Sequence, residues 1–405
     1  METSAIETVI AAPVQKLAKT RLIHLDLLRG LAILMVLGAH LPKSDHMPFL
    51  IDLWHRGGGS GVDLFFVLSG FLIGGLLFDE FRRTGGIGFK RFIVRRGFKI
   101  WPSYLIYLAV CFVDLARLER GAWLSRLRRV MAQLWPNMLH IQNYLFTPFQ
   151  HTWSLAVEEH FYLLLPLLLF WMMRRPKAGP DRNPFRAFPA IFIGLAVFCL
   201  LARVLTAWLV KPFDLFIHVF PTHLRMDSLM LGVLLAYLVR FHRSWIDRLY
   251  PHRTMIFLIS VALFVPVFLI DHNSTAWMYA VWPGPLSLGA AGLVLLAFFA
   301  SQKNPRSTNP IVRAVSWVGI YSYSIYLWHV PFSQSMTLHV TSRLEGHGIH
   351  SGWTGMIAIY VALAVVFGAV MYRIIEFPAL AVRDRLFPAR GLSAIRDPSI
   401  SSASA

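Results

Sequence analysis

Hydrophobic residues fall along this chain in long runs separated by short polar segments. A helix needs about 20 apolar residues to cross a bilayer. Ten runs meet this length or come close to it, at about residues 24–41, 62–78, 98–115, 152–173, 187–210, 216–239, 254–270, 284–300, 315–338 and 353–374. The pattern predicts an all-α polytopic membrane protein with about ten transmembrane helices in one bundle.

The polar segments between the runs are short, so we expect one membrane domain. The predicted parts are a cytoplasmic amino-terminal arm at residues 1–21, the transmembrane domain at 22–378, and a basic, partly disordered cytoplasmic tail at 379–405. No segment leaves room for a separate soluble catalytic domain. Any chemistry is therefore expected from the helices and their loops.

Composition excludes a soluble basic protein. The chain is 56% hydrophobic and carries a net charge of +18. Its lysines and arginines cluster at alternate ends of the apolar runs, which indicates topology and not a nucleic-acid surface. The positive-inside rule places both termini in the cytoplasm. We expect the lipid bilayer, and no nucleic acid, as a partner; the sequence carries no signal for an oligomeric state.

One connecting segment departs from this charge pattern. Five arginines between the third and fourth runs lie on the predicted outer side. They alternate with apolar residues, which predicts an amphipathic helix on the membrane surface. The apolar residues are Leu118, Trp123, Leu124, Leu127, Val130 and Leu134.

Several kinds of chemistry find no motif here. Cys111 and Cys199 are the only cysteines and both lie in apolar runs, so neither a disulfide framework nor a cysteine metal site is expected. There is no GxSxG, Walker or HExxH motif. The first outer loop is rich in acids and histidines without standard metal-site spacing, so no metal and no bound cofactor are predicted. These residues are His40, Asp45, His46, Asp52 and His55.

Arg29 and His40 lie eleven residues apart in the first run. Eleven steps of about 100° place both side chains on one helix face, roughly 16 Å apart. Titratable groups inside a membrane usually face a bundle interior or a water-filled cavity and serve substrate or proton chemistry. The alternative is that Arg29 pairs with Asp26 one turn earlier while His40 lies at the headgroup boundary.

Asp63 begins the second run at about the depth of His40. A contact between them would orient the imidazole as a proton acceptor. Alternatively, Asp63 satisfies free backbone donors at a helix start. Ser69 and Gly70, with Gly74 and Gly75, favour close helix packing over a nucleophile.

A dense basic cluster precedes the third run. Guanidinium groups suit phosphate oxygens, so the cluster is a candidate site for a nucleotide-like donor. The alternative is topology combined with binding of anionic lipid. The cluster consists of Arg82, Arg83, Lys90, Arg91, Arg95, Arg96 and Lys99.

His151, Ser154, Glu158 and Tyr162 follow offsets 0, 3, 7 and 11, so they form one polar stripe on the fourth run. Glu159 projects about 100° away. Two adjacent carboxylates in an apolar run predict either a proton donor or partners for an intramembrane cation such as Arg225 or Arg203.

Two later runs also carry polar residues on one helix face. In the sixth, His223 and Asp227 share a face, and in the ninth, Ser322, Tyr326 and His329 do. Each set fits interhelical hydrogen bonding as well as a site. Arg373 and Glu376 are predicted to form an ordinary interfacial pair.

Five segments, 25–40, 61–72, 153–162, 225–229 and 322–329, together resemble acyltransferase family 3, in that family's order and over about 22–378. Its members are multi-span, mostly bacterial membrane proteins. They move acetyl or other acyl groups from acyl-CoA to hydroxyls of envelope glycans, oligosaccharides or exported small molecules. The resemblance implies ten spans, acyl-CoA as donor, and Arg29 with His40 as the essential first-span pair.

The chain departs from the family pattern at two positions. The family's cytoplasmic Arg-x-x-Arg is Arg96-Gly97-Phe98-Lys99 here, which keeps the charge and loses one bidentate fork. The family's glutamine after the paired glutamates is His160, which adds a titratable group.

The resulting hypothesis is O-acyl transfer inside the bundle of a multi-pass protein of a bacterial inner membrane. His40 accepts the proton of an acceptor hydroxyl, which attacks the thioester of acyl-CoA, expected to be acetyl-CoA. Asp63 or Glu158 holds or relays the proton, and Arg29 anchors the donor or offsets negative charge. The other candidate substrate-binding residues are Arg95, Arg96, Lys99, Glu159, Arg225, Asp227, Tyr326 and His329.

Two other classes of function stay open at this point. A transporter or flippase would use the buried charges for a polar solute or a proton path, and it would need no acyl-CoA. A lipid-binding scaffold would tolerate replacement of these charges. The expected acceptor is a carbohydrate or another envelope or exported hydroxyl compound.

Overall fold

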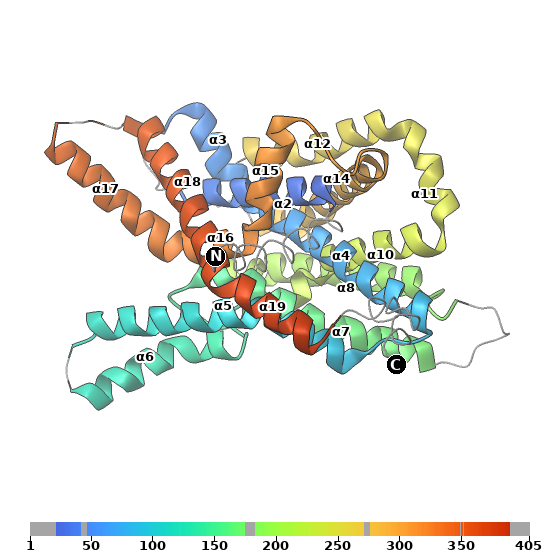
Figure 1. The fold of residues 1–405 in the computed structure, drawn as a ribbon, viewed down its shortest axis with the longest axis horizontal. Coiled ribbons are helices and arrows are strands. Elements are labelled where there is room, and N and C mark those ends of the chain that lie inside the picture. Colours follow the sequence, from blue (N-terminus) through green and yellow to red (C-terminus); the bar gives the residue numbers. More distant parts are fainter. Residues whose placement is uncertain are drawn as a thin grey trace, which may run out of the picture.

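The computed structural model describes residues 22–41, 47–120, 122–174, 183–270, 276–348, 350 and 352–388, and within these ranges it contains helices and no strand (Figure 1). The first half comprises α2 (Ile23–Ala39), α3 (Phe49–Gly57), α4 (Gly61–Thr84), α5 (Phe89–Leu118), α6 (Trp123–Met138), α7 (Trp153–Arg174), α8 (Phe188–Leu209) and α9 (Leu215–His218). The second half comprises α10 (Met226–Phe241), α11 (Arg243–Leu249), α12 (Arg253–Leu269), α13 (Ala276–Val281), α14 (Pro283–Lys303), α15 (Pro310–Ile320), α16 (Ser322–Trp328), α17 (Gln334–Gly346), α18 (Gly352–Met371) and α19 (Phe377–Leu386). The predicted all-helical class is confirmed.

Seven helical segments of the described part are long and apolar enough to cross a membrane. The segments are Phe49–Thr84, Phe89–Leu118, Gln150–Arg174, Phe188–Leu209, Arg243–Leu269, Pro283–Lys303 and Gly352–Leu386. α2, with 17 residues, and α10, with 16, are shorter than the usual span. The count of ten spans and the orientation of the termini stay predictions.

Two predicted runs are not continuous helices. The run at 216–239 breaks after α9, and Pro221 precedes a 3₁₀ turn at Thr222–Leu224 before α10 begins. The run at 315–338 breaks at Tyr321 and then widens to a π-helix at His329–Ser333. Pro331 lies in this turn and has no N–H to donate, which accounts for the interruption of the regular α-helical hydrogen bonds. Hydrophobic periodicity alone does not reveal either break.

Close packing at glycines fixes the centre of the bundle. A Cβ atom on Gly70 of α4 would overlap the carbonyl oxygen of Leu229, and one on Gly232 of α10 would overlap that of Val67. Gly30 of α2 and Gly319 of α15 face each other's helices in the same way. Small residues let helix backbones approach this closely, as predicted for Gly70. These glycines therefore let α4 lie directly against α10 and α2 directly against α15.

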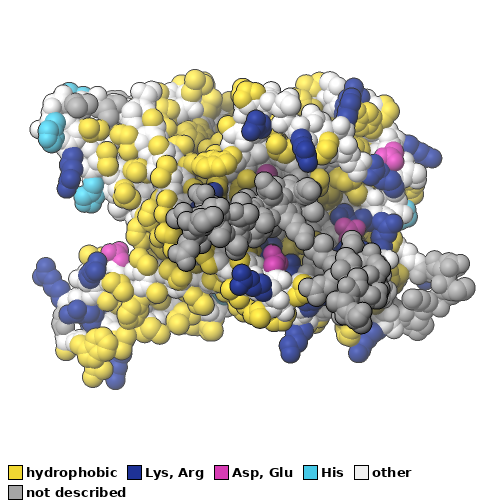
Figure 2. Space-filling view, viewed as in Figure 1, with side chains coloured by type: hydrophobic (Ala, Val, Ile, Leu, Met, Phe, Trp, Pro, Cys, Tyr) yellow, Lys and Arg dark blue, Asp and Glu magenta, His cyan; other side chains and the backbone are white. Residues whose placement is uncertain are grey.

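Helices α6 and α17 lie at the edge of the molecule (Figure 1). The amphipathic helix predicted between the third and fourth runs is present as α6, which buries Val130 and Leu134 against α5. Trp123 and Leu124 stay exposed. In the space-filling view, hydrophobic side chains cover broad areas of the visible face (Figure 2). Such a surface suits contact with lipid.

The start of the predicted carboxyl-terminal tail is helical. α19 continues through the expected border at residue 379 to Leu386 and packs against α5. Arg95 of α5 donates hydrogen bonds to Asp384 and to the carbonyl oxygen of Phe387, which accounts for the added order. The arm at 1–21, the tail at 389–405, and Asp45 and His46 lie outside the described residues.

Candidate active site in two cavities

Two internal cavities contain most of the predicted site residues and divide them into two groups. The large cavity has a volume of ≈ 570 Å³ and the small cavity one of ≈ 180 Å³. Arg29, Arg96, Lys99 and Glu158 line the large cavity. His40, Asp63 and Arg225 line the small cavity. Tyr326 lines both. Arg29 and His40 therefore share one helix but serve different cavities.

His40 caps the carboxyl end of α2 at the wall of the small cavity. Its Nδ1 lies 3.0 Å from the carbonyl oxygen of Val36. A carbonyl oxygen only accepts, so Nδ1 carries the hydrogen of the neutral ring and Nε2 keeps a lone pair. Gln334 donates a hydrogen bond to the His40 backbone carbonyl, which holds this residue in place. The arrangement leaves Nε2 as the proton-accepting atom.

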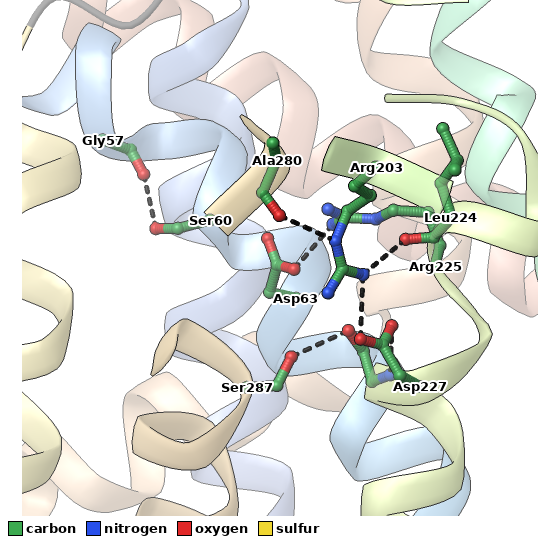
Figure 3. Close-up of polar contacts among 10 residues, drawn as sticks. Gly57, Ser60, Asp63, Arg203, Leu224, Arg225, Asp227, Ala280 and Ser287 are labelled. Carbon is green, nitrogen blue, oxygen red and sulfur yellow. Dashed lines mark hydrogen bonds and ion pairs between the residues drawn. The ribbon is translucent and has the colours of Figure 1, made fainter. Parts of the chain in front are cut away.

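Asp63 does not contact His40 through a hydrogen bond; it forms an ion pair with Arg225. The Arg225 guanidinium lies 2.6 Å from Asp63 Oδ1, and both side chains are buried (Figure 3). The predicted Asp63–His40 contact is therefore wrong. Arg225 enters the cavity from the turn before α10 and neutralises the acid on α4. His40 takes its orientation from Val36 instead.

A second buried ion pair joins Arg203 of α8 to Asp227 of α10 at 2.8 Å (Figure 3). Arg203 also donates to the carbonyl oxygens of Leu224, at 2.8 Å, and Ala280, at 3.0 Å. Arg203 thus links α8 to α13 and to the turn that carries Arg225, and Asp227 neutralises it. The interpretation that Arg203 or Arg225 pairs with the glutamates of the fourth run is wrong. Asp227 neutralises Arg203, and Asp63 neutralises Arg225.

The polar stripe predicted on α7 faces the large cavity at Ser154 and Glu158. Glu158 accepts a hydrogen bond of 2.7 Å from Tyr162. Arg96 lies over the Tyr162 ring, 4.2 Å from its centroid, and donates to the same phenol oxygen. Glu158 is therefore held next to a cation in the large cavity, apart from His40. Glu159 lines neither of the two cavities.

Arg29 agrees with both interpretations of its position, as a residue that faces a cavity and as the partner of Asp26. It forms an ion pair of 3.2 Å with Asp26 and also lines the large cavity. Lys99 lines the same cavity. Arg95 lines neither of these cavities and instead lines an adjoining basic pocket of ≈ 190 Å³. Arg96, Lys99 and Arg383 line both this pocket and the large cavity.

His151, which the sequence indicates only as a member of the polar stripe, belongs to the site. It lines the small cavity, with its ring centroid 6.4 Å from that of His40. His329 lies behind both rings, 4.7 Å from His40 and 5.6 Å from His151. The three histidines are far apart in the sequence, so the sequence does not reveal this cluster. The 3₁₀ turn Gln150–Thr152 and the π-turn reach the end of α2 only in the folded bundle.

Glu376 is a second residue whose place the sequence did not reveal. It is buried, lines the large cavity and accepts a hydrogen bond from Ser324. The predicted interfacial role for Glu376 is therefore wrong. His223, predicted to share a face with Asp227, lies at the surface against Tyr144. The 3₁₀ turn before α10 separates these two side chains.

The small cavity combines groups suited to moving a proton and to stabilising an anion. His40 and His151 supply imidazoles, and Arg225 supplies a guanidinium group. The large cavity combines several cations with long apolar walls. Within the described ranges, no three or more histidine, cysteine or acidic residues are arranged to hold a metal ion. The geometry suits transfer chemistry between two bound molecules, one in each cavity.

Comparison with known proteins identifies the kind of domain. A family model described as an acyltransferase domain, that of acyltransferase family 3, matches residues 22–373. The chain is 27% identical over 373 residues to the peptidoglycan O-acetyltransferase OatA of Listeria monocytogenes, covering 87% of this chain and 55% of that protein. It is 25% identical over 371 residues to the O-acetyltransferase OatA of Staphylococcus aureus, covering 87% of this chain and 56% of that protein. The chain thus spans about half the length of these curated relatives. No solved structure matches the chain.

Proposed function

The chain belongs to acyltransferase family 3, and on this premise we propose that it is a membrane O-acyltransferase that uses acyl-CoA. It moves an acetyl or other short acyl group to a hydroxyl of a carbohydrate or another envelope or exported compound. The observation that carries the proposal is the division of the site: several cationic side chains line one cavity and the His40 imidazole lines the other.

The large cavity is the proposed donor site. Arg29, Arg96 and Lys99 bring positive charge to its wall, together with Arg383. Guanidinium and ammonium groups recognise phosphate oxygens through charge-assisted hydrogen bonds. The apolar wall formed by residues such as Leu72 accommodates the less polar arm that carries the thioester. Lys99 replaces the second arginine of the family motif and supplies charge without a fork.

The small cavity is the proposed site of proton removal from the acceptor. His40 Nε2 takes the hydroxyl proton while the acceptor oxygen attacks the thioester carbonyl carbon. The Arg225 guanidinium stabilises the negative charge that develops on the carbonyl oxygen. Asp63 holds that guanidinium in place, since the two are joined at 2.6 Å. Asp63 thus changes from a proton relay to a positioning residue.

The basic end of the bundle is proposed to face the cytoplasm, where acyl-CoA is available. Lys99, Arg240 and Arg383 lie on this side of the large cavity, in agreement with the positive-inside rule. His40, at the opposite end of α2, then lies toward the outer face. A bacterial inner membrane is the proposed location, and an envelope carbohydrate is the proposed acceptor, since one relative is named for acting on peptidoglycan.

Release of CoA thiol tests this function. The purified protein is incubated in detergent with acetyl-CoA and a mixture of soluble peptidoglycan fragments and oligosaccharides. We expect free thiol to appear together with an equal amount of acetyl ester, measured with a thiol reagent and by mass spectrometry. Omitting the acceptors is the control. Absence of thiol with acetyl, propionyl and butyryl donors would contradict the proposal and favour a transporter.

A further inference from the structure

Tyr326 lies between the two cavities. Among the residues that the structure describes, Val62 and Tyr326 are the two that line both cavities, and Tyr326 is the one with a polar side-chain group. Its phenol hydroxyl donates to the backbone carbonyl oxygen of His151. The phenol has a single hydrogen, so the Ser154 hydroxyl, 2.6 Å away, must be the donor to the phenol oxygen. The phenol oxygen is thus held at the border of the cavities.

This position defines where a thioester must lie. The following inference rests on the proposed function. His40 lines the small cavity and not the large one, whereas Arg96 and Lys99 line the large cavity and not the small one. Val62 and Tyr326 are lining residues of both cavities, so a donor held by these cations that brings its carbonyl carbon to His40 at this border passes beside them. The sulfur atom then lies beside the phenol of Tyr326.

We propose that Tyr326 is the general acid that protonates the departing sulfur of the donor. The acceptor oxygen forms its bond to the carbonyl carbon and its proton moves to His40. The C–S bond then breaks and its electron pair stays on sulfur. The phenol proton of Tyr326 leaves its hydrogen bond with the His151 carbonyl oxygen and moves to that sulfur. The imidazolium of His40 returns a proton to the phenolate, since both residues line the small cavity. The products are the ester and the free thiol, and both residues are regenerated.

Two physical features support this role. The hydrogen bond from Ser154 stabilises the negative charge on the phenolate until it is reprotonated. The ring of Tyr326 also lies 6.2 Å from that of His151 and 5.7 Å from that of His329, so its orientation is fixed.

Tyr326→Phe tests the proposal, because it removes the hydroxyl and keeps the ring. We expect kcat/KM with acetyl-CoA to fall about 10²-fold, as for loss of a positioned acid. S-phenyl thioacetate releases a far more acidic thiol that needs no proton on departure. With this donor we expect Tyr326→Phe and wild-type protein to differ less than about threefold. Rates are measured as thiol release and ester formation.

Tyr323→Phe is the matched control. Tyr323 is in the same helix, donates to the Ile100 carbonyl oxygen at 2.9 Å, and lines the large cavity alone. Loss of the Tyr323 hydroxyl should change the rates with acetyl-CoA and with S-phenyl thioacetate by the same factor. Ser154→Ala should also lower the rate with acetyl-CoA more than the rate with S-phenyl thioacetate, but by a smaller factor than Tyr326→Phe. It replaces Tyr326→Phe in the test if that variant is recovered poorly. An equal loss with both donors in Tyr326→Phe would overturn the role as acid. Absence of thiol release by wild-type protein would instead contradict the proposed function.

Discussion

Replacing His40 by glutamine is expected to lower acyl transfer by about 10³-fold, toward the upper part of the range for general base catalysis. Glutamine has a similar size and can still donate to the Val36 carbonyl oxygen, which His40 Nδ1 contacts at 3.0 Å. It cannot accept a proton from the acceptor hydroxyl. The measurement is the initial rate of thiol release with purified protein. Size-exclusion chromatography should show that the His40→Gln protein is folded like the wild type.

His55→Gln is the control for this substitution. His55 also contacts a backbone carbonyl of α2, that of Gly38 at 3.3 Å. It does not line the small cavity. We expect its replacement to change the rate by less than about threefold, as for substitutions away from a site. Wild-type rates in His40→Gln would exclude His40 as the base.

Breaking the buried Asp63–Arg225 pair is expected to cost about 3–5 kcal/mol of stability. Asp63→Asn leaves the Arg225 guanidinium without its counter-ion in a buried site, where the partners lie 2.6 Å apart. The double replacement Asp63→Leu with Arg225→Met removes both charges, so its stability should lie closer to that of the wild type. It should still lack transfer activity, because no cation faces the carbonyl oxygen. Denaturant unfolding in detergent and thiol release measure the two effects.

Asp247→Asn is the control, because Asp247 forms an exposed pair of 2.8 Å with Arg243. Exposed helical pairs contribute about 0.3–0.5 kcal/mol, so this change should be small. Equal destabilisation by Asp63→Asn and Asp247→Asn would contradict the buried pair. Activity in the double variant would exclude Arg225 as the group that stabilises the oxyanion.

Helical periodicity predicted the parts of the site that lie on one helix. The spacing of Ser154 and Glu158 predicted one polar face, and both residues line the large cavity. Arg29 and His40 were predicted on one helix face, and they line different cavities. These are local relations that the helix repeat determines. The resemblance to acyltransferase family 3, based on five ordered segments, is confirmed by the family model over residues 22–373.

Contacts between residues on different helices could not be predicted from helical periodicity. Asp63 and Arg225 are 162 positions apart, and nothing in either segment selects one partner over another. His151 joins His40 only because the 3₁₀ turn before α7 reaches the carboxyl end of α2 in the bundle. The π-turn at His329 and the break before α10 depend on tertiary packing and proline, which hydrophobic periodicity does not record. The division into two cavities therefore emerged from the structure.

Vesicles that separate donor from acceptor show whether the acyl group passes through the bundle. The purified protein is reconstituted in liposomes loaded with soluble peptidoglycan fragments, acetyl-CoA is added outside, and protease accessibility determines orientation. For molecules whose basic end faces outward, we expect acetyl esters on fragments inside and an equal amount of free thiol outside, with neither in His40→Gln. Acetylation only when fragments and acetyl-CoA share one side would contradict a path from the large cavity to the small one.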